Sequence, residues 1–280
     1  MIPGEPSTTA RWVAFARGLG EYESPPLVAD PHAVDLLNAP WSTMLRIAGR
    51  WPRATRLAVA TMDTLSRGRS RFMSYRTRVL DDVVRQASAD GIEQVVILGA
   101  GLDARAWRLP ELATARVFEV DHPDTQGYKR ARMGEGRVTY VPVDFDRETA
   151  ADPLVAAGLD VSRPSVVLWE GVVMYLPEAT IDATLAAMRP VLATGSRLAI
   201  SYSRRGSTLA RLERELVGLI VSGAGERFRH REDPPQMRGR LERQSFRVLW
   251  DEGHPDWAPR LLGRRRGWDL QRIVVCEPAR

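Results

Sequence analysis

The chain has 280 residues, 44% of them hydrophobic and 27% charged, which is the composition of an ordinary globular protein without low-complexity or repeated segments. Its formal charge of +5 is modest and comes almost wholly from arginines that are interspersed with acids, so it does not indicate nucleic-acid binding. Lys129 is the only lysine, no GxxxxGK[ST] run is present, and no apolar run reaches the roughly 18 residues that span a bilayer.

The chain begins with Pro3, Gly4 and Pro6 in place of the basic and apolar parts of a signal peptide, so we expect a cytoplasmic protein. Residues 1–90 have helical periodicity and no strand pattern. The sequence predicts four helices in this cap: one capped by Ser7 or Thr8, and others at 31–37, 51–65 and 78–89.

From Val95 the pattern changes to alternating strands and helices. Continuous apolar runs separated by helix-length segments are typical of a parallel sheet covered on both faces. We expect strands at 95–98, 117–120, 138–143, 165–169 and 198–202. Pro177 begins the clearest intervening helix, which extends to Met188.

The rest of the chain has a weaker pattern. Residues 204–244 read as an inserted helical segment, Arg264 to Arg266 as an exposed loop, and 246–250 and 270–276 as two further strands. Cys276, the only cysteine, lies in an apolar run where a buried structural thiol is expected. The whole predicts one α/β domain with a doubly wound, seven-stranded, mostly parallel sheet, divided into 1–90, 91–203, 204–244 and 245–280.

Acidic side chains follow successive strands of this predicted sheet. The first strand ends at Gly99-Ala100-Gly101, and the next three end at Glu119 and Asp121, at Asp144 and at Glu170. Ligands of doubly wound folds bind at these carboxyl ends. The GxGxxA pattern with an acid about 20 residues later also occurs in dinucleotide-binding proteins, so by itself it does not identify the ligand.

Charge separates the two nucleotide classes. A diphosphate rests on the helix that follows the first strand, and Asp103 at that point would repel it. S-adenosylmethionine has no phosphate; its sulfonium, ammonium, ribose hydroxyls and adenine amino group all need acceptors. Glu119 or Asp121 suits the ribose, Asp144 the adenine and Glu170 the cationic amino-acid end. Arg76 or Arg78 can bind its carboxylate in bidentate fashion.

As a set these motifs resemble the leucine carboxyl methyltransferase family, most closely its bacterial branch, which includes methyltransferases of polyketide biosynthesis. The resemblance spans about residues 6–203. It rests on Arg76 to Arg78, Gly99 to Arg105, Glu119 to Pro123, Asp144-Phe145 and Glu170 to Leu176, together with residues 6–10 and 30–33.

The resemblance implies a Rossmann-like class I methyltransferase with a helical lid and S-adenosylmethionine as cofactor. It implies that Arg78 or Arg76 holds the cofactor carboxylate, Asp121 the ribose, Asp144 and Phe145 the adenine, and Glu170 the amino-acid end. Phe145 replaces the leucine usual at its position. The expected cofactor-binding residues are Arg76, Arg78, Gly99, Ala100, Gly101, Asp103, Glu119, Asp121, His122, Asp144, Phe145, Glu170 and Gly171.

The implied reaction is in-line transfer of a methyl group to an oxygen of a small carboxylic acid or hydroxylated natural product. A carboxylate acceptor is already ionised at neutral pH and needs no base. A phenol or alcohol would benefit from one, and the sequence offers His32, His122, His230 and His254 without assigning a catalytic residue. Tyr22 and Tyr175 are candidate acceptor contacts. We expect no metal, nucleic-acid or membrane partner.

Three other functions remain open at this stage. A nicotinamide-dependent oxidoreductase shares the glycine motif. A regulator could bind S-adenosylmethionine without catalysis. A nucleic-acid-modifying enzyme would show binding that depends on salt. The sequence predicts no oligomeric state.

Overall fold

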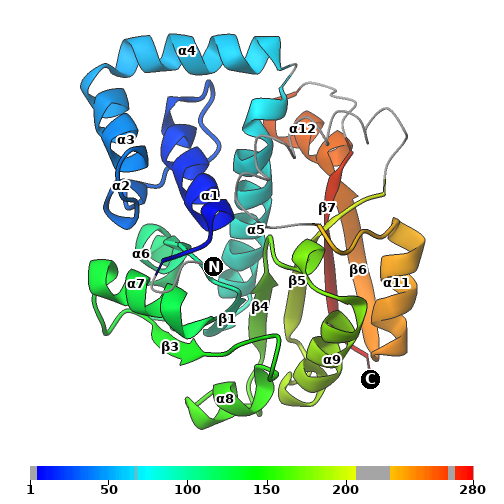
Figure 1. The fold of residues 1–280 in the computed structure, drawn as a ribbon. Coiled ribbons are helices and arrows are strands. Elements are labelled where there is room, and N and C mark those ends of the chain that lie inside the picture. Colours follow the sequence, from blue (N-terminus) through cyan, green and yellow to red (C-terminus); the bar gives the residue numbers. More distant parts are fainter. Residues whose placement is uncertain (1–4, 67, 206–227, 264–268, 280) are drawn as a thin grey trace.

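Every regular element that the structure describes before Gln94 is helical. A computed structural model describes residues 5–66, 68–205, 228–263 and 269–279, and Figure 1 shows its arrangement. The predicted segments 204–244 and 264–266 fall partly or wholly outside these ranges. The N-terminal helices are α1 (Thr8–Leu19), α2 (Ala33–Leu36), α3 (Trp41–Arg50), α4 (Pro52–Leu65) and α5 (Phe72–Ala89).

The start of α1 is capped as its sequence predicts. The Ser7 hydroxyl accepts a hydrogen bond from the Ala10 N–H at 3.0 Å, which satisfies one of the unpaired donors of the first turn. The sequence did not predict α3, and it placed the start of α5 at Arg78, six residues too late.

The sheet has seven strands in the order β3-β2-β1-β4-β5-β7-β6. The first five strands pair in parallel, and β7 runs antiparallel to β5 and β6. The doubly wound, mostly parallel prediction is therefore confirmed. The strands are β1 (Gln94–Leu98), β2 (Arg116–Asp121), β3 (Thr139–Pro142), β4 (Ser165–Trp169), β5 (Arg197–Ser203), β6 (Phe246–Gly253) and β7 (Gln271–Pro278).

Helices cover both faces of this sheet. Side chains alternate along β1, so that Val96 and Leu98 pack against α8, α9 and α11, whereas Val95 and Ile97 pack against α5 and α12. Each such side chain contributes about 1.5–3 kcal/mol on burial. The remaining described helices are α6 (Arg105–Arg108), α7 (Pro123–Met133), α8 (Ala151–Ala156), α9 (Glu178–Met188), α11 (Pro234–Arg243) and α12 (His254–Leu262).

A separate apolar cluster fixes the N-terminal cap to the core. Phe15 of α1 and Leu36 of α2 pack together with Leu102 and with Tyr128 of α7. Arg17 of α1 also donates a hydrogen bond to the carbonyl oxygen of Leu102. The cap is thus attached to the loop that follows β1, where the predicted glycine motif lies.

The strand register places the motif residues side by side. Leu98 of β1 pairs with Val120 of β2 on one side and with Trp169 of β4 on the other. The residues that follow these three in the chain are Gly99, Asp121 and Glu170, and they therefore lie next to one another at the edge of the sheet. The strand order reverses between β1 and β4, which is where ligands bind in open α/β sheets.

Two further findings concern the chain as a whole. Among the described helices, none combines the length and the apolar character needed to span a bilayer. Cys276 is fully buried on β7, and burial raises the pKa of its thiol far above the ordinary value. A thiol in that state is a packing group.

Candidate functional site

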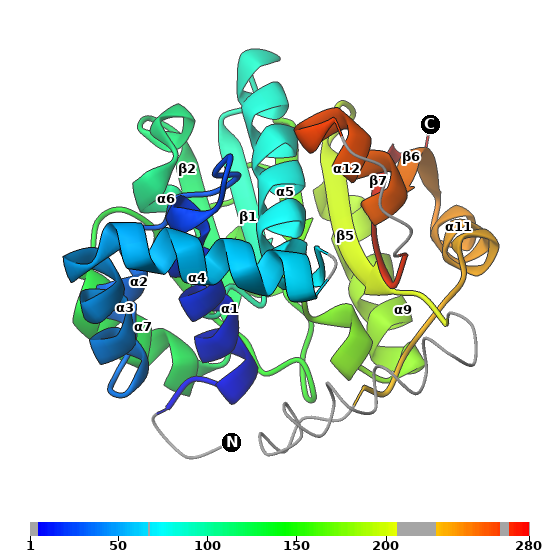
Figure 2. The same cartoon turned by 90° about the horizontal axis from the view of Figure 1, so that it is seen from above.

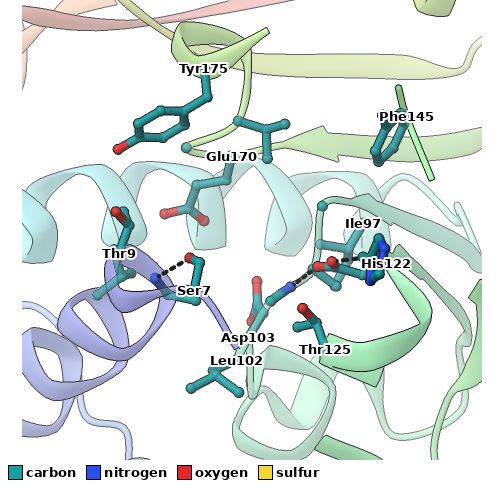
Figure 3. A pocket seen from close by; sticks show the side chains of 18 of the residues that line it. Ser7, Thr9, Ile97, Leu102, Asp103, His122, Thr125, Phe145, Glu170 and Tyr175 are labelled. Carbon is teal, nitrogen blue, oxygen red and sulfur yellow. Dashed lines mark hydrogen bonds between the residues drawn. The ribbon is translucent and has the colours of Figure 1, made fainter. Parts of the chain in front are cut away.

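A cavity of about 280 Å³ lies at the carboxyl ends of β1, β2 and β4, closed on one side by the first turns of α1 (Figure 3). Most of the residues that the sequence singled out line it. They are Arg76, Gly99, Ala100, Gly101, Asp103, Asp121, His122, Asp144, Phe145, Glu170, Gly171 and Tyr175.

The glycine loop after β1 needs glycine at its first position. Gly99 has φ +66°, and a Cβ built there would lie 2.3 Å from Cγ2 of Val172. Its N–H and that of Ala100 donate to the Val120 carbonyl oxygen at 2.8 and 3.0 Å, and the Gly101 N–H donates to the Asp121 carboxylate. These three N–H groups are therefore engaged within the protein, whereas a bound diphosphate would need free donors of this kind.

The carboxylate of Asp121 connects the glycine loop after β1 to the turn after β2. Its Oδ1 accepts the His122 N–H at 2.7 Å and its Oδ2 accepts the Gly101 N–H. Burial raises the pKa of Asp121, and the two backbone donors partly offset that rise. Each oxygen keeps a further lone pair, so the group can accept hydrogen bonds from a pair of ligand hydroxyls.

Glu170, at the end of β4, is held between two arginines. Its Oε1 accepts from Nε of Arg76 at 2.9 Å and its Oε2 from Nη2 of Arg105 at 2.8 Å. Burial opposes ionisation, yet Arg76 and Arg105 keep the pKa of Glu170 below its usual value. Glu170 is therefore ionised at neutral pH.

Arg105 extends this pair into a buried network. Its guanidinium contacts Asp103 at 3.0 Å and Asp81 at 3.3 Å, and Arg108 donates to Asp81 at 2.7 Å. Three arginines thus face three carboxylates, and the network is electrically balanced. Despite burial, the cations around Asp103, with Arg105 foremost, keep its pKa well below the usual range.

Arg76 lies at the edge of this network and lines the cavity. Its Nη1 donates to Oε1 of Gln271 at 3.2 Å, and its Nη2 lies 3.4 Å from the position that a Cβ on Gly171 would take. The remaining donors of the guanidinium are available for a ligand carboxylate, which is the bidentate partner that arginine geometry suits.

Phe145 lies at the far end of the cavity from Tyr175 and Thr9 (Figure 3), and Asp144, which precedes it in the chain, also lines the cavity. Oδ1 of Asp144 accepts the Asp146 N–H at 3.1 Å. Phe145 is half-buried and packs against the core cluster on the α8–α9 face. This end of the cavity therefore combines the Phe145 ring with the acceptor oxygens of Asp144, whose carboxylate also pairs with Arg147 at 3.3 Å.

Three residues proposed from the sequence lie outside the cavity. Arg78 is two residues beyond Arg76 on α5, about 200° round the helix, and it forms an ion pair with Asp82 at 3.0 Å. Of the two alternatives, only Arg76 faces the cavity. Tyr22 lies within the cap, where burial raises its pKa to about 12.

Glu119 is the third of these, and it is buried behind the cavity. Its Oε2 accepts from Nζ of Lys129 at 2.6 Å, and burial raises its pKa to about 7 in spite of this cation. Lys129 also donates to the carbonyl oxygen of Asp103. The pair supports the glycine loop from behind, and of the two acids on β2 only Asp121 lines the cavity.

The sequence predicted a helical lid, but it did not indicate which residues of α1 line the cavity. Ser7, Thr9, Ala10, Val13 and Arg17 line the cavity, as does Thr125 of α7. Oγ1 of Thr9 is buried and has no hydrogen-bond partner within the described residues. The only local signal was the Ser7 cap, since the packing of α1 against the loop depends on contacts that are distant in sequence.

The four histidines are dispersed. His122 lines the cavity at the Phe145 end, and its Nδ1 accepts the Asp124 N–H at 3.3 Å. His32 precedes α2, His230 lies 3.3 Å from Glu232, and His254 packs edge-on against Tyr75. In the parts of the chain that the structure describes, no cluster of His, Cys, Asp or Glu has the arrangement of a metal site.

Comparison with known proteins identifies related chains. A model of the leucine carboxyl methyltransferase family matches residues 10–189. A protein of Mycobacteroides abscessus is 36% identical over 202 residues, which cover 69% of this chain and 64% of that protein, just under two thirds of its length. One of Mycolicibacterium paratuberculosis is 32% identical over 289 residues, covering 96% and 85%. Both are provisionally named S-adenosyl-L-methionine-dependent methyltransferases.

Solved structures show the same fold. A DUF574-family protein of Streptomyces avermitilis superposes with a TM-score of 0.61 at 17% identity and covers 98% of both chains. A protein of Thermobifida fusca, named provisionally as a methyltransferase, superposes with a TM-score of 0.60 at 20% identity and covers 81% of this chain and 89% of its own.

Proposed function

This chain belongs to the leucine carboxyl methyltransferase family of S-adenosylmethionine-dependent methyltransferases, and we propose that it methylates an oxygen of a small, natural-product-like acceptor. The acceptor group in this proposal is a carboxylate, with a hydroxyl as the alternative. The observation that carries the proposal is the cavity at the ends of β1, β2 and β4, where carboxylates converge and the loop N–H groups are already used.

The residues present fit S-adenosylmethionine. Asp121 would accept from the ribose hydroxyls, Asp144 from the adenine amino group, and Phe145 would form the apolar wall beside that ring. Arg76 would bind the carboxylate, and Glu170 would face the ammonium. Because the buried network of three arginines and three carboxylates is balanced, it suits an amino-acid end that is itself a zwitterion.

When bound, the cofactor supplies a methyl carbon made electrophilic by a positively charged sulfur. The protein's part is to orient the acceptor and exclude water, and α1 supports that role because it closes the cavity beside the glycine loop. A Cβ on Gly101 would lie 3.4 Å from Cβ of Ala10, which shows how closely the helix covers the loop.

The position of the histidines favours a carboxylate acceptor. All four histidines are described, and His122, the one that lines the cavity, lies at the end of Phe145, away from Glu170, Thr9 and Tyr175. Of the other three, none lines the cavity: His230 donates its backbone N–H to the carbonyl oxygen of Met174, next to Tyr175, but its ring lies against Glu178 and Glu232. A carboxylate is ionised at neutral pH and requires no base.

The test has two parts. Calorimetry measures S-adenosylmethionine binding by the wild type, by Asp121→Ala and by the control Asp82→Ala, whose residue lies outside the cavity. We expect Asp121→Ala alone to weaken binding by about 1.5–3 kcal/mol. Unchanged affinity would remove Asp121 from the cofactor site.

The second part uses radiolabelled cofactor with matched acceptors: aromatic and aliphatic acids, their methyl esters, and phenols. Label that alkali releases as methanol marks a carboxyl ester, and label stable to alkali marks an ether. If the protein binds the cofactor but forms no S-adenosylhomocysteine with any acceptor of either class, the proposed O-methylation is contradicted.

A further inference from the structure

The apolar side chains of helix α4 lie outside the hydrophobic core. None of its fourteen residues is buried, and Leu57 and Leu65 are 70% and 77% exposed. Of eleven large apolar side chains that are exposed among the described residues, six lie between Met44 and Leu65. Such concentration is unusual for a soluble surface and marks a site of interaction.

The geometry of α4 directs these side chains outward. At 100° per residue, the half-buried Thr55, Val59 and Asp63 share the side that faces the protein. Leu57, Thr61 and Leu65 occupy the opposite side. The two leucines of this helix therefore point to solvent, whereas Val59 and Met62 lie nearer the side that faces the protein.

Helix α3 continues the same face. Leu45 and Ala48 are buried against the cap, whereas Met44, Ile47 and Trp51 follow one another at helical spacing on the exposed side. We call the six exposed large apolar residues of these two helices the α3–α4 surface: Met44, Ile47, Trp51, Leu57, Met62 and Leu65. It forms the outermost layer of the cap, and α4 lies across α1 in Figures 1 and 2.

Positive charge accompanies this surface. Residues 38–71 contain seven arginines and a single acid, Asp63. Arg46, Arg50, Arg53 and Arg56 are exposed on α3 and α4, and none of the four forms an ion pair with another described residue. A partner of this surface must accept apolar side chains and supply negative charge together.

We propose that the α3–α4 surface binds peripherally to an anionic lipid surface. A basic helix with an exposed apolar face binds in the plane of the headgroups, with its apolar side chains inserted and its arginines on the phosphates. Trp51, at the bend between the helices, is a residue type that favours this interfacial depth. A second copy of the chain is disfavoured, because a two-fold contact would bring two arginine-rich faces together.

This inference is independent of the acceptor's identity. It departs from the expectation that the protein has no membrane partner, and it concerns attachment to a lipid surface, for which a helix that spans the bilayer is not needed. Each neutralised arginine is expected to change the partition coefficient about fivefold at low salt.

Flotation with phosphatidylcholine vesicles, with and without phosphatidylserine, provides the test. We expect wild-type protein to float with the anionic vesicles only and to be released by salt. The double variant Leu57→Glu/Leu65→Glu and the variant with Arg46, Arg50, Arg53 and Arg56 changed to Gln should each lose binding. Val161→Glu and Arg238→Gln, exposed positions elsewhere, are matched controls that should retain it.

Cofactor affinity and thermal unfolding establish that each variant is folded, since no residue of the α3–α4 surface lines the cavity. Failure of the wild type to float with anionic vesicles at low salt overturns the proposal. So does binding that survives Leu57→Glu/Leu65→Glu. Equally strong binding to polyglutamate, or a dimer that this double variant dissociates, would assign the surface to an acidic protein or to a second copy instead.

Discussion

Gln271 on β7 accepts a hydrogen bond from Arg76 on α5 at 3.2 Å, although 195 positions separate them in the chain. This contact connects the antiparallel end of the sheet to the cavity. It assigns a role in the site to a segment for which the sequence offered no motif, because it holds one nitrogen of the guanidinium while Glu170 holds another.

Replacing Gln271 with Leu should free Arg76 to rotate. Loss of one hydrogen bond to a charged group corresponds to about 1.5–3 kcal/mol, so we expect KM for S-adenosylmethionine to rise at least tenfold with little change in kcat. Gln86→Leu, which removes an exposed helical contact with Asp90, is the control. Equal effects on KM and kcat would argue against simple positioning.

Arg105→Met should destabilise the protein strongly. Arg105 is fully buried and contacts three carboxylates, so its removal leaves one negative charge without a partner in the interior. Breaking a buried ion pair by removal of one partner costs about 3–5 kcal/mol. Denaturant unfolding measures the loss, and the double variant Arg105→Met/Glu170→Gln should recover part of it. No recovery would mean that charge balance is not the cause.

Gly99→Ala should impair both folding and cofactor binding. The backbone at this position has φ +66°, and the new Cβ would meet Cγ2 of Val172 at 2.3 Å. Strain of about 1–3 kcal/mol is expected from the backbone alone. Adding Val172→Ala should relieve the clash and leave the backbone term, so partial rescue in thermal unfolding is the predicted result, and full rescue would show that only the clash mattered.

Stability should depend on pH through Glu119. Its pKa is about 7 in the folded protein against an ordinary value of 4.5, so the folded state binds more protons between these values, and its stability falls as pH rises through that range. The contribution of this raised pKa to the free energy of unfolding, present in full at low pH, is about 3 kcal/mol. Glu119→Gln should flatten this part of the curve. An unchanged slope of the unfolding free energy between about pH 5 and pH 7 in this variant would contradict the assignment.

Thr9→Val tests whether α1 contributes to the acceptor site. Oγ1 of Thr9 is buried without a described partner, so its removal should leave the free protein as stable as before or slightly more so. If the hydroxyl binds the acceptor, KM for the acceptor should rise several-fold while cofactor affinity stays constant. A loss of stability would instead show that the hydroxyl has a structural partner.

The sheet could be predicted because its signals are local. The apolar runs that became β1, β2 and β4 ended within a residue of their predicted limits, and the carboxyl-edge motif followed from them. The choice between Arg76 and Arg78 could not be made from sequence, since it depends on how α5 is rotated against the sheet. The same holds for Glu119, whose partner Lys129 lies on the next helix.

The cap was harder to predict for a different reason. Helix α3 is amphipathic but only ten residues long, and its apolar face is divided between the buried Leu45 and Ala48 and the exposed Met44 and Ile47; the sequence reading did not recognise it. The contribution of α1 to the cavity depends on contacts between Phe15, Leu102 and Tyr128, which are far apart in the chain.

The burial of Lys129 has a practical consequence for chemical labelling. The single lysine side chain of this protein is 1% exposed and its amine is held by Glu119. Acylating reagents and lysine-directed cross-linkers will therefore find no side-chain amine on the native surface. The rate at which such a reagent modifies Lys129 therefore reports local opening of the loop behind the cavity, and ligands that stabilise that loop should lower this rate.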